Sequence, residues 1–373
     1  MAPFKVFKLK VDREDYEESL TKIAVDLRPA WDKDKIHIKE FKDGVIHKVL
    51  HCYHGDSSTQ DDSLVFRIFP NDDLYIYIEG DEHQVVMNQQ IANRSGNGPE
   101  LLATFANGTV SSYVKGTTMK NSDFKNIDVI KQLTDHIARL HTVDLDSEFY
   151  DFHGKPMKYE GRLKFIEVIR HLFEIQDIPT TCRDPEKKAL LEKYFKEDDL
   201  RRDTDFAEEF IRRANLPLCH SHYDLHKNNL IIDRESGKIT LIDFDVGGLM
   251  FECTDIASFW KGDSVADDRS DDDIPAGLSE EEFQVWIRCY LEAKNKQLGK
   301  EGEEVPDWQI RKFRIQCEMV NTLTSLSPSI WALNGFEDFT LYDSFGLALA
   351  SRKTFLSGKS KLDELLLEYQ ALG

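Results

Sequence analysis

Cysteines are few in this sequence, and long apolar runs are missing. The six cysteines are scattered over 373 residues without a Cys-x-x-Cys pair, which argues against a zinc ribbon and against a disulfide framework. No stretch approaches the roughly 18 apolar residues of a membrane span. The opening residues, Met-Ala-Pro-Phe-Lys-Val-Phe-Lys, lack the apolar core of a signal peptide. We therefore expect a soluble, cytoplasmic protein with reduced thiols and no stable membrane insertion.

Positive charge is also scarce. The 48 lysines and arginines face 68 acidic residues, which gives a formal charge of −20. Such a chain repels phosphate-rich partners, so we expect it not to bind nucleic acid. A cationic small molecule is an easier ligand for it. A homodimer remains an open alternative, because nothing in the sequence decides the oligomeric state.

Three common catalytic motifs are absent. The chain has no Gly-x-x-x-x-Gly-Lys-Ser/Thr, no His-Glu-x-x-His and no Gly-x-Ser-x-Gly, which argues against a P-loop enzyme, a metalloprotease and a serine hydrolase. Any nucleotide must therefore be held in another way.

The apolar pattern predicts two lobes. With 40% apolar and 11% aromatic residues, the chain can bury one large two-lobed core or two packed domains. Helices are predicted at 17–27 and 81–93, and β-rich runs at 35–41, 45–53, 63–69, 101–105 and 109–114. We predict a strand-rich N-terminal lobe over residues 1–115.

Helical spacing dominates the rest of the chain. Apolar residues recur at helical intervals between Ile127 and Leu140. Ser279-x-x-Glu282 before an apolar run is a capping box that opens another helix. We predict a mostly helical catalytic and substrate-binding lobe over residues 116–373, and an α+β fold for the whole chain.

One short segment carries the chemistry. His222-x-Asp224 is followed five residues after the aspartate by Asn229, and then by Asp243 at the end of an apolar strand. These residue types and intervals match the catalytic loop and metal loop of protein-kinase-like enzymes. The sequence therefore predicts a bilobal, protein-kinase-like fold, also found in aminoglycoside phosphotransferases, with ATP and Mg²⁺ as cofactors.

Each of these residues has a physical role in that prediction. Phosphoryl transfer needs a carboxylate to accept or orient the substrate hydroxyl, and Asp224 suits that role. Asn229 and Asp243 supply the oxygen ligands that Mg²⁺ prefers, and His222 is expected to brace the loop. The plainer alternative is a β-hairpin whose polar ends only cap turns. Four matched residue types at two matched intervals favour the kinase.

Three candidates for nucleotide binding lie in the N-terminal lobe. The turn around Gly44, which ends at Lys48, is a candidate for covering the phosphates, and Arg67 on a β-rich run is a candidate for pairing with their oxygens. Glu82, early in the next helix, is a candidate partner for Arg67. A glycine turn and a solvent-facing arginine are the ordinary alternatives.

Several segments resemble the choline/ethanolamine kinase family in order and spacing, and the likeness runs from about residue 20 to 350. They are Leu-Arg-Pro-Ala-Trp-Asp (27–32), Phe-Lys-Asp-Gly-Val-Ile-His-Lys (41–48), Val-Phe-Arg-Ile-Phe (65–69), Gly-Pro-Glu-Leu (98–101), Ile-Ala-Arg-Leu-His (137–141), the loop 222–229, Asp-Phe-Asp (243–245) and Asp-Ile (255–256). The first two look more like ethanolamine kinases than choline kinases. The resemblance implies that Asp224 is the catalytic base, and that Ser112 to Gly116, including Val114, is a hinge near the adenine.

The amine pocket departs from the family pattern. The family usually has a glutamate a few residues after the Asp-Ile pair, where this chain has Trp-Lys-Gly-Asp ending at Asp263. Of two paired tryptophans only Trp331 remains, and Pro328 takes the other position. A trimethylammonium group depends on several aromatic rings, so the pocket favours a primary amine. Asp263 and Asp245 are candidates for the negative charge around that amine.

The resemblance therefore implies an ATP:ethanolamine phosphotransferase that forms phosphoethanolamine for phosphatidylethanolamine synthesis, with a small amino alcohol as substrate. Two alternatives stay open. One is a kinase of the same fold for choline or another small alcohol, including an aminoglycoside-phosphotransferase-like enzyme. The other is an inactive relative that binds nucleotide and acts as a scaffold.

Overall fold

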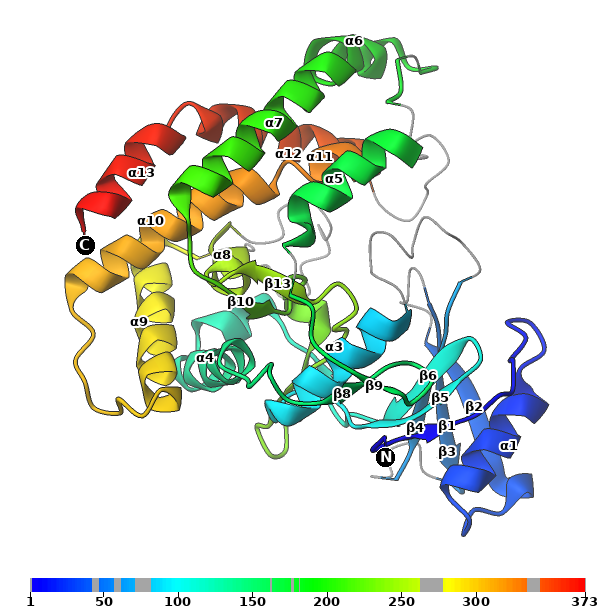
Figure 1. Ribbon diagram of the computed structural model, residues 1–373. Helices are drawn as coiled ribbons and strands as arrows, with labels where there is room; N and C mark the ends of the chain where they lie inside the picture. Colours follow the sequence, from blue (N-terminus) through cyan, green and yellow to red (C-terminus); the bar gives the residue numbers. More distant parts are fainter. Residues whose placement is uncertain are drawn as a thin grey trace. The chain divides into compact units, whose positions relative to one another are not determined.

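The computed structural model describes residues 2–41, 47–56, 62–70, 82–161, 163–175, 178–180, 182–261, 278–333 and 343–372. It divides into two compact units (Figure 1). The first comprises Met1–Met119, Val143–Glu160 and Lys227–Gly247, and the second comprises Lys120–Thr142, Gly161–His226 and Gly248–Gly373. Both have their own buried core.

A six-stranded sheet of order β1-β5-β6-β4-β3-β2 forms the centre of the first unit. Its strands pair antiparallel except β1, which runs parallel to β5. The β-rich runs predicted from the sequence are confirmed where the structure describes them. The strands are β1 (Lys5–Val6), β2 (Ile36–Phe41), β3 (Lys48–His54), β4 (Leu64–Ile68), β5 (Leu101–Phe105) and β6 (Gly108–Ser112).

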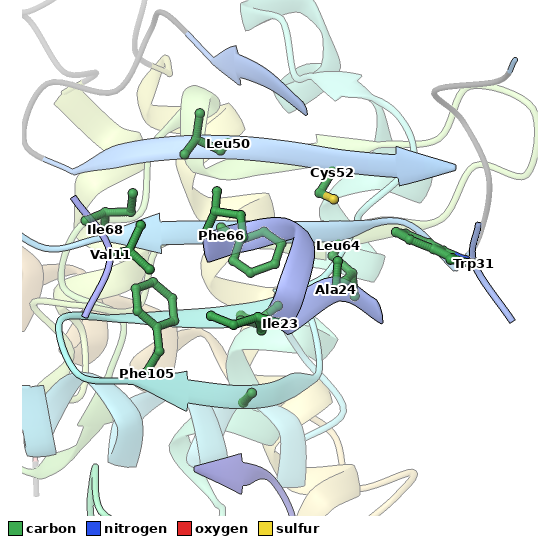
Figure 2. Packing of buried hydrophobic residues seen from close by; sticks show 13 residues of the cluster. Val11, Ile23, Ala24, Trp31, Leu50, Cys52, Leu64, Phe66, Ile68 and Phe105 are labelled. Carbon is green, nitrogen blue, oxygen red and sulfur yellow. The ribbon is translucent and has the colours of Figure 1, made fainter. Parts of the chain in front are cut away.

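One face of this sheet carries a hydrophobic core under helix α1 (Glu17–Leu27). Figure 2 shows Ile23 and Ala24 of α1 beside Leu64, Phe66 and Phe105 of the sheet. Because side chains alternate along a strand, the residues between the core positions point to the other face. In β4 that alternation turns Arg67 away from the core, since Phe66 and Ile68 on either side of it are buried.

Helix α3, short 3₁₀ helices and short strands complete the described part of the first unit. The hairpin β11–β12 pairs Leu230 with Leu241, so Asn229 and Asp243 lie at the same open end of the hairpin. The elements are η1 (Lys33–Lys35), α3 (Glu82–Arg94), β7 (Thr117–Thr118), β8 (Phe149–Tyr150), β9 (Pro156–Met157), η3 (Lys227–Asn229), β11 (Leu230–Ile232) and β12 (Ile239–Leu241).

Helices make up most of the second unit. The apolar stripe between Ile127 and Leu140 is on one helix, as predicted, and the capping box is present, with Ser279 Oγ accepting the Glu282 N–H. The elements are η2 (Asn121–Lys125), α4 (Ile127–His141), α5 (Lys164–Ile175), α6 (Pro185–Tyr194), α7 (Glu197–Ala214), β10 (Leu218–Ser221), β13 (Gly248–Phe251), α8 (Thr254–Lys261), α9 (Glu280–Gln297), α10 (Asp307–Thr324), α11 (Pro328–Trp331), α12 (Ser344–Lys359) and α13 (Leu362–Ala371).

The two units divide the chain differently from the predicted boundary at residue 115. The first unit runs to Met119 and also contains 227–247, because β11 pairs antiparallel with β7. It contains 143–160 as well, where β8 contributes to the packing around α3. Among the helices in the described ranges, none is both long enough and apolar enough to cross a bilayer.

Gly108 provides a test of the sheet's close packing. A Cβ built there lies 2.1 Å from the Arg67 carbonyl oxygen and 2.3 Å from Phe105 Cζ. We expect Gly108→Ala to destabilise the protein by at least the ~1–3 kcal/mol typical of overpacking, measured as a lower urea midpoint. Gly248→Ala is the matched control, because a Cβ on that strand glycine meets no atom within 4 Å. Equal midpoints for the two variants would contradict the packing argument.

Candidate active site

The loop that carries Asp224 is fixed through its backbone. It follows β10, and the carboxylate of Asp255 in α8 accepts two of its N–H groups. The His222 N–H lies 2.8 Å from Asp255 Oδ2, and the Tyr223 N–H lies 2.8 Å from Asp255 Oδ1. Tyr223 has a φ of 69°, a left-handed conformation that is costly for a tyrosine. The two hydrogen bonds stabilise the loop in this conformation.

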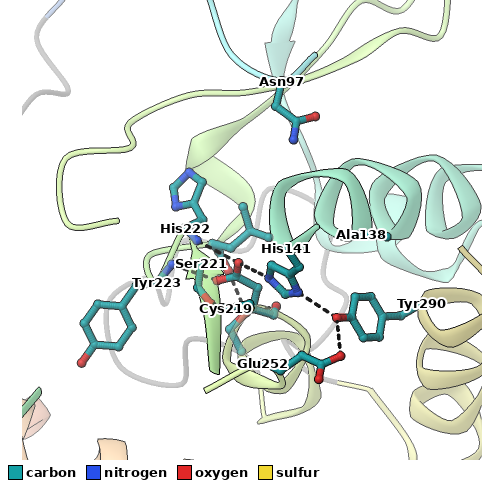
Figure 3. A network of polar contacts seen from close by, with 12 residues as sticks. Asn97, Ala138, His141, Cys219, Ser221, His222, Tyr223, Glu252 and Tyr290 are labelled. Atoms are coloured by element: carbon teal, nitrogen blue, oxygen red, sulfur yellow. Dashed lines mark hydrogen bonds and ion pairs between the residues drawn. The ribbon is translucent and has the colours of Figure 1, made fainter. Parts of the chain in front are cut away.

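A buried polar network supports Asp255 from the other side. His141, at the end of α4, contacts Asp255 Oδ2 through Nε2 at 3.0 Å, and its Nδ1 lies 2.8 Å from the Tyr290 hydroxyl. Tyr290 in turn donates to Glu252 at 3.0 Å. Figure 3 shows His141 between the end of β10 and Tyr290. This order of contacts fits a His141 that donates from both ring nitrogens.

The pKa shifts agree with an ion pair. Burial alone lowers the pKa of an imidazole, but the neighbouring Cys219 and the hydrogen-bonded Asp255 outweigh burial and raise the pKa of His141 to about 10. Burial raises the pKa of the Asp255 carboxyl, yet the hydrogen bond and charge of His141 hold it below its usual range. Both groups are therefore charged near neutral pH.

Asp224 itself remains open to solvent. Its side chain is 51% exposed, and His226 Nε2 lies 3.5 Å from its Oδ2. The backbone before it is fixed while the carboxylate is accessible. This is the combination that a group acting on a bound hydroxyl needs.

A second cluster lies in the first unit, around Arg67. The guanidinium bonds Asp245 with both terminal nitrogens, at 2.8 Å and 2.5 Å, and Asp243 Oδ1 at 3.0 Å. His47 Nε2 lies 2.8 Å from Asp245 Oδ2. Burial raises the pKa of the Asp245 carboxyl, but Arg67 and His47 hold it well below its usual range. Asp245 is thus an ionised, buried anchor for Arg67.

The predicted metal ligands fit a hard divalent cation. Asn229 and Asp243 flank one end of the β11–β12 hairpin, where the Ile242 N–H donates to the Asn229 carbonyl at 2.9 Å. Asp243 has a φ of 65°, and its side chain is 44% exposed. Carboxylate and amide oxygens are the donors that Mg²⁺ prefers.

Asn88 of α3 fixes the loop that follows Asp243. Its buried side-chain amide donates to the carbonyls of Phe244 at 2.9 Å and Gly247 at 2.7 Å. The loop therefore keeps its shape through a side chain from another element.

The structure separates two of the predicted phosphate ligands. Lys48 precedes Val49, which pairs with Arg67, so Lys48 lies on the opposite face of the sheet. Its Nζ bonds the Arg13 carbonyl at 2.6 Å and lies 4.8 Å from the Tyr16 ring centroid. A lysine held there does not join Arg67 at one phosphate site. Gly44 lies outside the described residues.

Three further predictions have mixed outcomes. Arg67 pairs with Asp243 and Asp245 rather than with Glu82, which is exposed at the start of α3 beside His83 and His153. This corrects the expected ion pair.

Ser112 ends β6, where its Oγ accepts the Glu100 N–H at 2.9 Å. Val114 lies in the connection that follows and is half-buried.

The predicted amine ligands also differ in position. Asp245 is buried with both oxygens bonded to Arg67, so its carboxylate is not exposed for a substrate ammonium. Trp331 ends the short helix α11 and is half-buried. Asp263 lies outside the described residues.

The sequence gives only weak signals for four residues that hold other parts of the site in place. His141, Asp255 and His47 appear only within segments that resemble the family. Asn88 has a physical signal, because it lies between Val85 and Ile91 on the buried face of α3. A polar residue at such a position usually has a hydrogen-bonding role.

Comparisons with known proteins identify the family. The family model for choline/ethanolamine kinase matches residues 38–356. The chain belongs to this family. Mouse ethanolamine kinase 2 is 25% identical over 342 residues, covering 90% of this chain and 81% of that protein. Human ethanolamine kinase 1 is 23% identical and covers 97% of this chain and 77% of its own length.

Solved structures share the fold. A Plasmodium vivax ethanolamine kinase aligns with a TM-score of 0.66 at 19% identity, covering 92% of this chain and 89% of that one. A choline kinase from Cryptosporidium parvum aligns with a TM-score of 0.71 at 16% identity, covering 95% of this chain and 98% of that one. A spectinomycin phosphotransferase aligns with a TM-score of 0.50 at 13% identity, covering 92% of this chain and 98% of that one. The predicted kinase-like α+β fold is confirmed.

The His141–Asp255 pair makes a prediction about pH. The pKa of His141 is about 10 in the folded protein and near 6.5 in the unfolded chain. The charged His141 therefore contributes its full stabilisation below pH 6.5. That contribution disappears as the pH rises through about 10. His141→Gln should destabilise the protein by ~3–5 kcal/mol near pH 6. The difference in the free energy of unfolding between the wild type and His141→Gln should become smaller towards pH 10.

The measurement is urea unfolding of both proteins across that pH range. Taking the difference between the two proteins removes the titration of groups that do not contact His141. His37→Gln, at an exposed histidine on β2, is the control. Its free energy of unfolding should equal that of the wild type across this pH range. A difference between the wild type and His141→Gln that stays constant with pH would show that His141 is not charged in the folded protein.

Proposed function

We propose that the chain is a magnesium- and ATP-dependent ethanolamine kinase that forms phosphoethanolamine for phosphatidylethanolamine synthesis. The observation that carries the proposal is the exposed Asp224 carboxylate on a loop whose backbone is held by the buried Asp255. The relatives named ethanolamine kinase, which match about nine tenths of the chain, support the choice of substrate.

Asp224 acts on the hydroxyl of the substrate. The carboxylate accepts a hydrogen bond from that hydroxyl and takes its proton as the oxygen bonds to the γ-phosphorus of ATP. The bond between the γ-phosphorus and its bridging oxygen breaks, and ADP leaves with the bonding electrons. Positioning and proton acceptance of this kind each contribute substantially to the rate.

Arg67, Asn229 and Asp243 serve the phosphates. Asp245, which His47 also contacts, holds the Arg67 guanidinium in a fixed orientation, and a planar guanidinium suits phosphate oxygens. Asn229 and Asp243 would hold Mg²⁺, which neutralises phosphate charge when bound. Because Arg67 Nη2 bonds Asp243, the arginine also balances the charge of this carboxylate. Ser112 and Val114 remain the proposed hinge near the adenine.

The substrate ammonium is proposed to be primary. Three N–H donors of a primary ammonium are satisfied by carboxylates and carbonyls, whereas a trimethylammonium has no donor and depends on aromatic faces. Pro328 begins α11 in place of a ring, and Trp331 is the aromatic residue at its end. Asp224 and Asp263 are the proposed carboxylates for the amino alcohol, since Asp245 is bonded to Arg67.

Asp224→Asn tests the catalytic role. The amide keeps the shape of the side chain but cannot accept the hydroxyl proton, so we expect turnover to fall by roughly 10² or more. ATP binding and the unfolding midpoint should remain near wild type, because the side chain is exposed. Steady-state rates, nucleotide titration and urea unfolding measure these. Asp198→Asn on the exposed side of α7 is the control, and wild-type turnover by Asp224→Asn would remove Asp224 from the mechanism.

Substrate choice is tested by ATP turnover with ethanolamine, choline and several amino alcohols in the presence of Mg²⁺. We expect a higher kcat/KM for ethanolamine than for choline. Trp331→Ala should raise the KM for choline more than the KM for ethanolamine, since only choline depends on the ring face. A higher kcat/KM for choline would assign the chain to choline phosphorylation. No turnover with any acceptor would favour the inactive, nucleotide-binding alternative.

A further inference from the structure

Two histidines and one carboxylate lie close together in the first unit, and of the three only Glu82 is among the predicted kinase residues. Glu82 and His83 are the first two residues of α3, and His153 lies on the turn between β8 and β9. One nitrogen from each histidine and one carboxylate oxygen of Glu82 all lie within 4.8 Å of one another. Two imidazoles and a carboxylate are a donor set of Zn²⁺ and related ions.

The turn that carries His153 is closed by its own hydrogen bonds. Asp151 Oδ1 accepts the N–H of His153 at 2.9 Å and the N–H of Lys155 at 2.8 Å. The Asp151 carbonyl accepts the Gly154 N–H at 2.9 Å, and Gly154 has a φ of 73° that favours glycine. The backbone at His153 is therefore fixed before any ion binds.

The start of α3 is attached to that turn. Phe152 and Val86 are buried in one hydrophobic cluster. The side chain of Gln90 bonds the backbone of Tyr150 in both directions, with its Nε2 at 2.7 Å from the carbonyl and its Oε1 at 3.1 Å from the N–H. The ligands from the two segments are thus held near one another by contacts that do not involve them, which lowers the cost of ordering a site.

The charge around the cluster suits a cation. The Asp151 Oδ2 lies 3.9 Å from His83 Nδ1, so a second carboxylate stands beside the histidine. At this distance the carboxylate adds negative charge beside the site but does not hydrogen-bond the ring, whose Nδ1 accepts the Phe152 N–H at 3.3 Å. Neutral imidazoles and two carboxylates together balance a divalent ion.

We propose that Glu82, His83 and His153 bind a divalent transition-metal ion of the Zn²⁺ class, with solvent completing the coordination. The ion would join the first turn of α3 to the β8–β9 turn. Two turns along α3, Asn88 donates to the carbonyls of Phe244 and Gly247. Zinc binding therefore stiffens the helix that holds the loop after Asp243.

The test is titration of Zn²⁺ into the full, tag-free chain with its thiols reduced and without nucleotide, followed by calorimetry. His83→Gln and His153→Gln should each lose one zinc equivalent, or weaken that site at least by the 10–100-fold that loss of an outer-shell partner costs. His37→Gln, at an exposed histidine on β2 of the same unit, is the matched control. Zinc bound by cysteines is common to all variants and cancels in the comparison.

Hydrogen exchange gives a second readout. Zn²⁺ should slow amide exchange in residues 82–94 and 149–157 of the wild type and of His37→Gln, but not of His153→Gln. Glu82→Gln is an additional variant for the case in which a histidine change disturbs folding, because Glu82 is exposed. Equal zinc stoichiometry and affinity in the wild type, Glu82→Gln and His153→Gln would overturn the proposal. Because no nucleotide or acceptor is present, failure here is distinct from failure of the kinase assignment.

Discussion

The buried carboxylate of Asp255 is the constraint on which the catalytic loop depends. It accepts N–H groups from His222 and Tyr223 and pairs with His141. Moving a carboxylate out of water costs several kcal/mol, and only a charged partner with good hydrogen bonds offsets that cost. The three donors come from α4 and from the end of β10, while the acceptor is on α8. One ion pair thus fixes three elements and, with them, the backbone that leads to Asp224.

The first unit repeats this arrangement with different residues. Asp245 is buried and bonded by Arg67 and His47, and the residue two positions before it, Asp243, is exposed. The four aspartates of the two units therefore divide into two kinds. Asp255 and Asp245 are buried, and they hold cationic side chains or backbone N–H groups in place. Asp224 and Asp243 instead keep about half of their side-chain surface exposed, 51% and 44%. The exposed pair is the one to which the kinase spacing assigns chemistry.

Periodicity and spacing predicted the strands, the α4 stripe and the kinase-like fold, because each depends on residues close in the sequence. The division of roles among polar residues depends on long-range pairing. Alternation alone does not show that Lys48 and Arg67 face opposite sides until the register of β3 against β4 is known. In the same way, Asp245 follows Asp243 by two residues, and nothing local indicates that Arg67 from β4 occupies both of its oxygens. These contacts are set by tertiary packing, which the sequence pattern does not encode.

Backbone strain shows why the anchors are needed at these places. Tyr223 and Asp243 both have a positive φ, 69° and 65°, and such a conformation costs on the order of 1–3 kcal/mol for a residue with a side chain. Each strained residue lies beside an anchored segment. The Tyr223 N–H bonds Asp255, and the carbonyls after Asp243 bond the amide of Asn88. Removing an anchor would let the loop relax to a common conformation, which would reorient the exposed aspartate. The positions of Asp224 and Asp243 are therefore properties of Asp255 and Asn88 as much as of the loops themselves.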